Sequence, residues 1–540
     1  MADHITLRLG DNDENRRWDG RKHKASAQCG DGHPNTLCLP NFVRAMQEQL
    51  HHVGIKLCVV NGKFDAATEA SVREFQIYAK MDIVAKEDPA KAHLPYADRL
   101  AAQPSTKKYG GPISGVFDRA TKDVLDHWVA PRHRWRCPVV LDVFDMSAGP
   151  PPRKAENVWR ASDSNVKQFT VRARDFTRIY GVDEKVWSNV GKTLKYKNGR
   201  GPVLGPEQAD HVTPEDPEGP GAEVLPETLL RRPWGRLGAE EQSTFRVVRA
   251  VAEIECHAFF DVVNGYDDGV ISEGICHFIV RPDGAGELAE LLTQFASHYP
   301  GDYRHAIERF GVNVVPPFPL FRMGSRFRFQ DETGGYPEPR LVKPKKKKKD
   351  DKEPRPLPEQ PYLDRIEQLR NWHWFYRFVM LGRHVHNFRL VQWQSAVDRL
   401  REIRARKAHP PKRPTHPVSD VFTSELAMAY LYRWDVNRPS DITGDGKEDR
   451  LDEIVAKAME QKPRLGWKQD PSKWGQPEED ALLEAIETVA RTRSNDEIPK
   501  MFVPLKAFPK AFPEEQRYWM MKWIPVGPLS TDRGSFRMVP

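Results

Sequence analysis

Apolar residues recur at helical spacing in several separate stretches of this 540-residue chain. The pattern in one of them predicts a largely buried helix from Thr244 to about His257, with Ser243 as its N-cap. Its buried face would consist of Phe245, Val247, Val248, Val251, Ala252 and Ile254. The same spacing predicts helices at 42–52, 286–297, 362–404 and 423–433. The apolar run 270–280 reads as a strand, and Asn264-Gly265 and Asp268-Gly269 before it are turn signals.

A short pattern occurs twice near the N-terminus, as Gly62-Lys-Phe-Asp-Ala-Ala-Thr68 and as Gly115-Val-Phe-Asp-Arg-Ala-Thr121. Each copy combines a glycine turn, an Asp or Thr N-cap and an amphipathic helix. With the preceding helix, which Gly54 would end, and the string Val72-Arg-Glu-Phe-Gln76, the arrangement resembles the peptidoglycan-binding domain of cell-wall hydrolases. The resemblance covers about residues 38–130 and implies a small three-helix domain that binds peptidoglycan. A helical bundle without a ligand is the alternative.

A second group of residues follows the buried helix, whose end carries Glu253 and Glu255. Next come the turn Asn264-Gly-Tyr-Asp267-Asp-Gly and the string Ser272-Glu-Gly274-Ile-Cys-His277. This order resembles the lysozyme superfamily, in which a helix delivers a general-acid Glu above a β-hairpin that lines the sugar cleft. The last string is similar to the Ser-x-Gly-x-x-Gln strand of lytic transglycosylases, with His277 in the place of Gln. The spacing of Asp267 and Ser272 is also similar to that of chitosanases, although Ser replaces Thr and the distance from Glu255 is shorter.

Cleavage of a glycosidic bond needs a protonated carboxylic acid beside the leaving oxygen and usually a second carboxylate that activates water or stabilises the oxocarbenium ion. A glutamate among Ile254, Phe259 and Phe260 would be desolvated, whereas Asp267 in a polar turn would stay ionised. The interpretation is therefore Glu255 as acid, Asp267 as base and Ser272 as the residue that positions water. Glu253 is the reserve acid. A salt-bridged helix end for Glu255 and a purely turn-forming role for Asp267 are the alternatives.

These resemblances predict a mainly α, multidomain protein: a three-helix peptidoglycan-binding domain and a lysozyme-like α+β catalytic domain with a β-hairpin. The expected divisions are an N-terminal tail at 1–37, the binding domain at 38–130, a mixed connector with a Pro/Gly-rich linker at 131–226, and the catalytic domain at 227–540. A Lys/Pro-rich insertion at 340–360, expected to be disordered, would interrupt the last of these.

Residues 441–452 place oxygen-bearing side chains at the spacing of an EF-hand loop, with glycine at its sixth position. The ligands would be Asp441, Thr443, Asp445, Asp449 and Asp452. A low-affinity calcium site is one interpretation and a charged turn before a helix is the other; no cofactor is required for the proposed chemistry. The six cysteines do not form a disulfide framework, and buried free thiols are favoured over a Cys29–Cys38 disulfide or a zinc site.

The net charge of +7 is modest and partly concentrated in the run Lys343–Lys349, which has no interleaved aromatic residues. Nucleic-acid binding is therefore not expected. No run approaches 18 apolar residues, so a membrane span is not expected either. The first residues show no secretory signal peptide, so a protein that acts in the periplasm or wall of a bacterium would depend on a phage holin or a secretion machine, in the latter case with an immunity protein as partner. The sequence favours a muramidase with peptidoglycan as substrate. A lytic transglycosylase, or a wall-binding or phage structural protein with an inactive lysozyme fold, are the alternatives.

Overall fold

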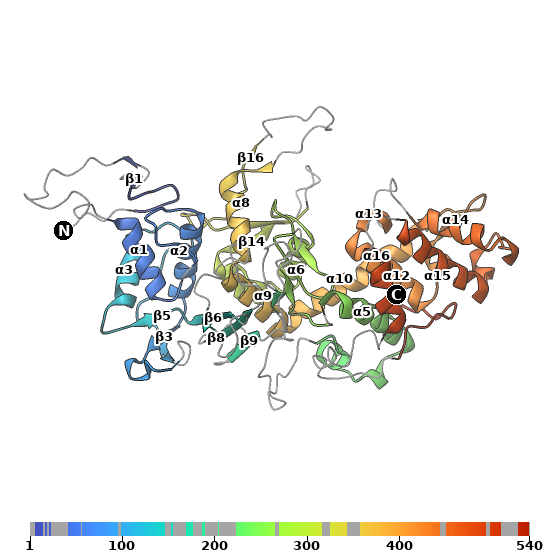
Figure 1. Ribbon diagram of the computed structural model, residues 1–540, viewed down its shortest axis with the longest axis horizontal. Coiled ribbons are helices and arrows are strands. Elements are labelled where there is room, and N and C mark those ends of the chain that lie inside the picture. Colours follow the sequence, from blue (N-terminus) through green and yellow to red (C-terminus); the bar gives the residue numbers. More distant parts are fainter. Residues whose placement is uncertain are drawn as a thin grey trace, which may run out of the picture. The chain divides into compact units, whose positions relative to one another are not determined.

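The fold is taken from a computed structural model of the full chain (Figure 1). It describes residues 6–14, 41–55, 57–94, 99–145, 223–256, 258–264, 269–315, 324–342, 357–442, 450–492, 497–508 and 527–538, and short strands at 17–18, 21–22, 153–154, 169–175, 186–189 and 203–204. About half of this structure is helical and the sheets are small and antiparallel, so the prediction of a mainly α protein is confirmed. No helix in the described ranges is long and apolar enough to cross a membrane.

The chain divides into two compact units. Unit 1 comprises Met1–Asp216, Val263–Ser272 and Ile279–Val385, and unit 2 comprises Pro217–Val262, Glu273–Phe278 and His386–Pro540. The segment 227–540 therefore contributes residues to both units, and the domain boundaries expected from the sequence stay a prediction.

The helices of unit 1 are α1 (Phe42–His52), α2 (Ala66–Ala79), α3 (Arg119–Val129), α6 (Glu287–His298), α7 (Pro300–Ala306), α8 (Gln360–Glu367) and α9 (Trp372–His384), with single 3-10 turns at Pro89–Lys91, Glu308–Phe310 and Gln368–Arg370. Its sheets are β1 (Arg17–Trp18) with β2 (Arg21–Lys22); β4 (Leu100–Pro104), β3 (Ile83–Glu87) and β5 (Trp135–Arg136); β7 (Arg153–Lys154), β6 (Val139–Asp145), β8 (Phe169–Asp175) and β9 (Val186–Asn189); β14 (Val312–Val315) with β15 (Arg326–Phe329); and β16 (Leu341–Val342) with β17 (Leu357–Pro358). A further sheet has the order β10 (Val203–Leu204), β11 (Val263–Asn264), β12 (Ile271–Glu273) and β13 (Phe278–Val280).

The first copy of the N-terminal repeat is held by a glutamine of α1. Oε1 of Gln47 accepts a hydrogen bond from the N–H of Gly62 at 2.9 Å, and its Nε2 donates to the carbonyl of Lys63 at 3.0 Å and to the Thr68 hydroxyl at 2.9 Å. Asp65 caps α2 by accepting from the N–H of Thr68 at 2.8 Å. The glycine, the aspartate and the threonine of the pattern thus serve one turn.

The second copy repeats this arrangement with a glutamine of α2. Oε1 of Gln76 accepts from the N–H of Gly115 at 2.9 Å, and its Nε2 donates to the carbonyl of Val116 at 2.9 Å and to the Thr121 hydroxyl at 3.1 Å. Asp118 caps α3 through the N–H of Thr121 at 2.7 Å. The internal repeat is therefore a repeated helix–turn–helix joint, which explains why these residue types recur together.

Helix α2 is buried on all sides within unit 1, from Ala67 to Ala79. Its Glu74 forms two hydrogen bonds with Arg377 of α9, at 3.1 and 2.6 Å, and both side chains are almost fully buried. The guanidinium of Arg377 also lies over the rings of Phe310 and Trp374, 4.8 and 4.7 Å from their centroids. A buried charge of this kind is stable only when it is paired, so these contacts fix α9 against α2.

Unit 2 consists of helices packed around α12 (Glu425–Asn437), and Figure 1 shows most of them in orange and red. The other helices are α4 (Pro226–Leu230), α5 (Ala239–Cys256), α10 (His386–Ala405), α11 (Val418–Val421), α13 (Pro439–Ile442), α14 (Leu451–Gln461), α15 (Gln476–Arg491) and α16 (Glu497–Ala507), with 3-10 turns at Trp234–Arg236, Pro463–Leu465 and Pro471–Lys473 and the pair β18 (Lys407–Ala408) and β19 (His416–Pro417). Ser424 caps α12, and every residue from Glu425 to Asp435 is buried. A helix that is apolar on nearly all faces belongs in a core, and α5, α10, α13, α15 and α16 contact it there.

Two predictions about the buried helix and the strand that follows it are wrong in detail. The buried helix begins at Ala239, so Ser243 is an interior residue, and its hydroxyl accepts from the N–H of Arg537 at 3.0 Å. The run 270–280 is two short strands rather than one, because Gly274 and His277 have φ angles of +74° and +47° and turn the chain between β12 and β13. The expected helices at 42–52, 286–297 and 423–433 are α1, α6 and α12, and 362–404 is divided among α8, α9 and α10.

Candidate active site

Helix α5 places Glu255 one residue before its last residue, Cys256. Glu240 and Glu241 lie in its first turn, where carboxylates stabilise the positive end of the helix dipole, and Glu241 accepts from the N–H of Gly238 at 2.9 Å. Apolar side chains cover the helix, so its C-terminal end is held inside unit 2. The Glu255 side chain is only 4% exposed. This burial means that its charge must have partners within the protein.

Three side chains from two other segments meet the Glu255 carboxylate. Nδ1 of His277 lies 3.0 Å from Oε2, and Nδ2 of Asn437 donates to Oε1 at 3.3 Å. Arg433, one helical turn before Asn437 on α12, forms an ion pair with the same carboxylate. Glu255 is thus at a point where α5, α12 and the β12–β13 turn converge within unit 2.

The turn that carries His277 is fixed by hydrogen bonds on both sides. The N–H of His277 donates to the carbonyl of Gly274 at 3.0 Å, which closes the turn. Oε1 of Gln392, on α10, accepts from the N–H of Ile275 at 3.3 Å. The Cys276 thiol lies 2.8 Å from the hydroxyl of a tyrosine of α12. A non-glycine residue with positive φ is strained, so the surrounding contacts must hold His277 in place.

The charges at this site favour an ionised Glu255. Burial lowers the pKa of the Arg433 guanidinium to about 9, which still leaves it cationic at neutral pH. A cation in contact with a carboxylate stabilises the ionised form. The sequence suggested apolar surroundings for this glutamate, whereas the structure gives it polar partners. The carboxylate must therefore receive a proton before it can act as an acid.

The other residues that the sequence interpretation assigned to the site lie elsewhere or outside the described residues. Glu253 accepts from Nε of Arg249 at 3.1 Å, in a buried ion-pair cluster with Glu223, and so does not share the surroundings of Glu255. Ser272 is fully buried in β12 and belongs to unit 1. Asp267 lies outside the described residues.

A second pair of carboxylates in unit 2 escaped the sequence interpretation. Asp261 and Glu273 are both fully buried. Burial, and second the negative charge of Asp261, raise the pKa of Glu273 well above its ordinary value. Both carboxylate oxygens of Glu273 lack a hydrogen-bond partner among the described residues. Its surroundings therefore favour the neutral, protonated form of Glu273 more strongly than water does.

The predicted calcium loop is described only at its ends. The carboxylate of Asp441 is buried and accepts from the indole N–H of Trp434 at 2.9 Å. Asp452 accepts from the backbone N–H of His409 at 2.6 Å. Thr443, Asp445 and Asp449 lie outside the described residues. The two described carboxylates thus have protein partners, and calcium binding stays a prediction.

The cysteines in the described ranges are free and buried: Cys58, Cys137, Cys256 and Cys276. Burial raises the pKa of Cys58 to about 11, so this thiol is not reactive at neutral pH. Cys29 and Cys38 lie outside the described residues. Within the ranges that the structure describes, no three His, Cys, Asp or Glu side chains are arranged to hold a metal ion.

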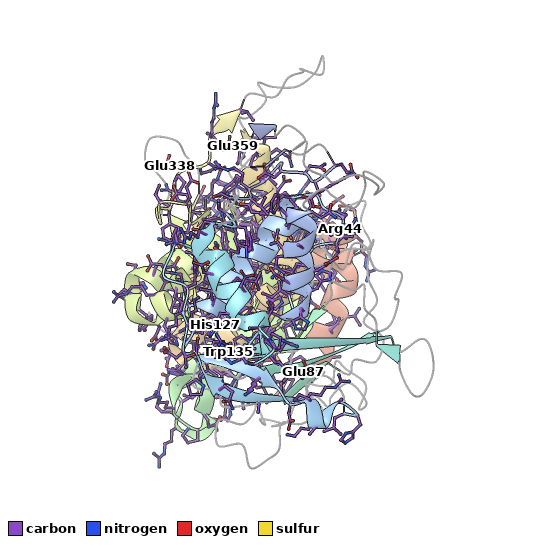
Figure 2. The ribbon with its side chains drawn as sticks, turned by 90° about the vertical axis from the view of Figure 1, so that its left-hand side faces the viewer. Arg44, Glu87, His127, Trp135, Glu338 and Glu359 are labelled. Atoms are coloured by element: carbon purple, nitrogen blue, oxygen red, sulfur yellow. The ribbon has the colours of Figure 1, made fainter. Side chains whose placement is uncertain are left out.

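Two features lie within or beside the predicted wall-binding domain: a small cavity and an aromatic pair. A cavity of about 30 Å³ lies beside α2, with room for about one water molecule, and is lined by Glu69, Arg73 and Arg365 among others. Figure 2 shows His127 and Trp135 beside each other, with ring centroids 5.0 Å apart, but Trp135 is 5% exposed and has no free face for a sugar ring. Neither feature supports a wall-binding surface on unit 1, and peptidoglycan binding by this unit stays a proposal.

Arg433, Asn437 and Gln392 are the residues of the site that the sequence interpretation missed. One signal was present: Arg433 interrupts the otherwise apolar run Leu426–Trp434, and a charge in a buried helix requires a partner of opposite charge. Which carboxylate would provide it depends on helix packing between residues far apart in sequence. No protein-family model matches this chain, and no curated protein or solved structure proved similar to it.

Proposed function

We propose that this protein is a glycosidase that cuts the glycan strands of bacterial peptidoglycan, with Glu255 as its proton-transferring carboxylate. The observation that carries the proposal is the position of Glu255: at the end of a buried helix, with polar contacts from the β12–β13 turn and from α12. A carboxylate held by groups from several elements is a preorganised site for moving one proton. The roles of Asp267 as base and of Ser272 as the water-positioning residue stay predictions from the sequence.

Cleavage would begin with transfer of a proton from Glu255 to the glycosidic oxygen as its bond to the anomeric carbon breaks. The anomeric carbon then takes up either water, which gives hydrolysis, or the sugar's own 6-hydroxyl, which gives an anhydro product. Hydrolysis is the leading proposal. The ion pair with Arg433 supports the second route as the alternative, because an ionised Glu255 can accept the proton of the attacking hydroxyl.

The N-terminal repeat supports peptidoglycan as the substrate, through its resemblance to wall-binding domains. A binding domain on the same chain keeps the enzyme near an insoluble polymer and raises its local concentration there. The protein would act in the periplasm or wall of a bacterium. The alternative is a protein that binds the wall and has no catalytic activity.

The test is release of soluble fragments from purified peptidoglycan by wild type and by Glu255→Gln. Glu241→Gln is the matched control, because Glu241 lies on the same helix at the surface, in an ion pair with Arg232. We expect wild type and the control to release fragments, and Glu255→Gln to release at least about 100-fold less. Mass spectrometry of the products then separates reducing ends from anhydro ends.

Two results would contradict the proposal. If wild type pellets with the wall but releases nothing, the protein is a binding protein. If Glu255→Gln releases fragments like the control, another residue carries the reaction. Circular dichroism and thermal unfolding of the variants show whether a loss of activity reflects a loss of fold.

A further inference from the structure

This inference rests on the proposed function and concerns the source of the proton that Glu255 transfers. Arg433 favours the ionised form of Glu255, and the Glu255 side chain is 4% exposed, so solvent reaches it poorly. His277 contacts the same carboxylate through Nδ1 at 3.0 Å, and its side chain is 22% exposed. The imidazole therefore connects a buried carboxylate with solvent.

We propose that His277 supplies the proton that Glu255 transfers to the leaving oxygen. The Nδ1–H bond of the imidazolium breaks, an O–H bond forms on Oε2 of Glu255, and a neutral imidazole remains. The carboxylic acid then gives this proton to the glycosidic oxygen, which leaves as a hydroxyl group. The attacking water or hydroxyl loses its proton to the regenerated Glu255 carboxylate, which passes this proton back to Nδ1 of His277, so that the carboxylate and the imidazolium are both restored.

Histidine suits this task because its charge changes near neutral pH, unlike that of Arg433 or of an amide. The resemblance places Gln at this position in lytic transglycosylases, and an amide can donate a hydrogen bond but cannot release a proton. The groups that meet His277 and its carboxylate partner include Arg433 and Asn437 from α12 and Glu255 from α5, and Gln392 from α10 holds the turn. His277 acts through Glu255, so it is a positioning residue and not a catalytic one.

The shape of the turn supports this role. His277 has a φ of +47°, and its turn is fixed by Gln392 and by the contact between Cys276 and Tyr432. A strained residue that its surroundings hold in place is found most often where its direction matters. Here that direction is toward the Glu255 carboxylate.

The test compares wild type with His277→Asn and His277→Gln over pH 4.5 to 8. Asn tolerates positive φ, and its amide nitrogen can take the position of Nδ1, so His277→Asn keeps the hydrogen bond and removes the transferable proton. We expect kcat of His277→Asn to be at least about 10-fold below wild type at pH 7, and the deficit to shrink toward pH 4.5, where the higher proton concentration partly replaces the proton that histidine supplies. KM should stay unchanged. His298→Asn, at an exposed histidine of unit 1, is the control and should follow wild type.

A second readout does not depend on activity. In protein labelled with ¹³C-histidine, the His277 ring signal is the one that His277→Asn lacks. We expect this signal to titrate at lower pH in Glu255→Gln than in wild type, because the negative charge that favours imidazolium is gone. An unchanged titration overturns the inference, and so does an equal loss of kcat at every pH. If wild type has no glycosidase activity, the proposed function fails instead, and the titration still decides whether the two groups are coupled.

Discussion

The side chain of Gln392 occupies the space that a side chain at residue 274 would need. A Cβ atom on Gly274 would lie 2.0 Å from Oε1 of Gln392, the atom that accepts from the N–H of Ile275. Nε2 of Gln392 donates to the carbonyl of Phe260 at 3.1 Å, so the amide joins two segments of unit 2 and has little room to move. The turn that carries His277 therefore requires glycine at residue 274.

Gly274→Ala should destabilise the protein by about 2 kcal/mol or more, since the φ of +74° and the contact with Gln392 both oppose a side chain. Chemical denaturation measures the change. Gly235→Ala is the matched control in unit 2, because a Cβ there meets no atom within 4 Å. A Gly274→Ala variant as stable as the control would show that the turn adapts.

Glu273→Gln should make the protein more stable at alkaline pH. The raised pKa means that Glu273 in the folded state ionises at a higher pH than in the unfolded chain, where the carboxyl group ionises near pH 4.5. The unfolded state then binds fewer protons, so wild type loses stability as the pH rises, by up to about 1.4 kcal/mol per pH unit between the two pKa values. Gln cannot ionise and avoids this loss.

Denaturation of Glu273→Gln and wild type at pH 5, 7 and 9 tests this pH dependence. The advantage of the variant should grow with pH, whereas Glu460→Gln, at an exposed carboxylate of α14, should show no such trend. An advantage that stays constant with pH would mean that Glu273 is ionised in the folded protein.

The buried ion pair between Glu74 and Arg377 should be strongly sensitive to the loss of one partner. Glu74→Gln leaves the guanidinium without its counter-charge, and we expect a loss of about 3 to 5 kcal/mol. The double variant Glu74→Gln, Arg377→Met should lose less than the sum of the two single changes. As a control, Glu338→Gln breaks the exposed pair with Arg328 and should cost less than about 1 kcal/mol. Equal costs for the buried and the exposed pair would contradict this account.

The stability of wild type should also fall in acid because of His373. Burial lowers its pKa to about 4, partly opposed by Glu74, so the folded state keeps it neutral while the unfolded chain takes up a proton below pH 6.5. The unfolded state binds more protons in this range, and stability is lost as the pH falls from 6.5 toward 4, by about 3 kcal/mol in total.

His373→Asn removes this titration, so its unfolding free energy should change less between pH 7 and 4.5 than that of wild type. The variant is expected to be less stable at pH 7, because it alters a buried contact in which Nδ1 lies 2.7 Å from the Tyr78 hydroxyl. The informative quantity is therefore the slope with pH. A slope equal to that of wild type would assign the acid sensitivity to other groups.

Local patterns in the sequence were sufficient for the helices and for the repeat. Apolar spacing predicted α1, α6 and α12 because a helix needs one or more apolar faces whatever its neighbours are. The repeated Gly-x-Phe-Asp-x-x-Thr string predicted two capped turns because glycine, aspartate and threonine act within a few residues of one another. The start of α5 was missed because Ser243, a good N-cap residue, lies inside the helix and bonds to Arg537 far along the chain.

The sequence by itself determined that Glu255 lies near the end of a buried helix, but it read residues 270–280, including His277, as one continuous strand. Only the tertiary structure decided that the two side chains meet, and that Arg433 and Asn437 join them. The physical reason is that burial makes a charge require a partner but does not choose it. That choice depends on how α5, α10 and α12 pack against one another. Their packing is determined jointly by residues that lie more than 100 positions apart in the sequence.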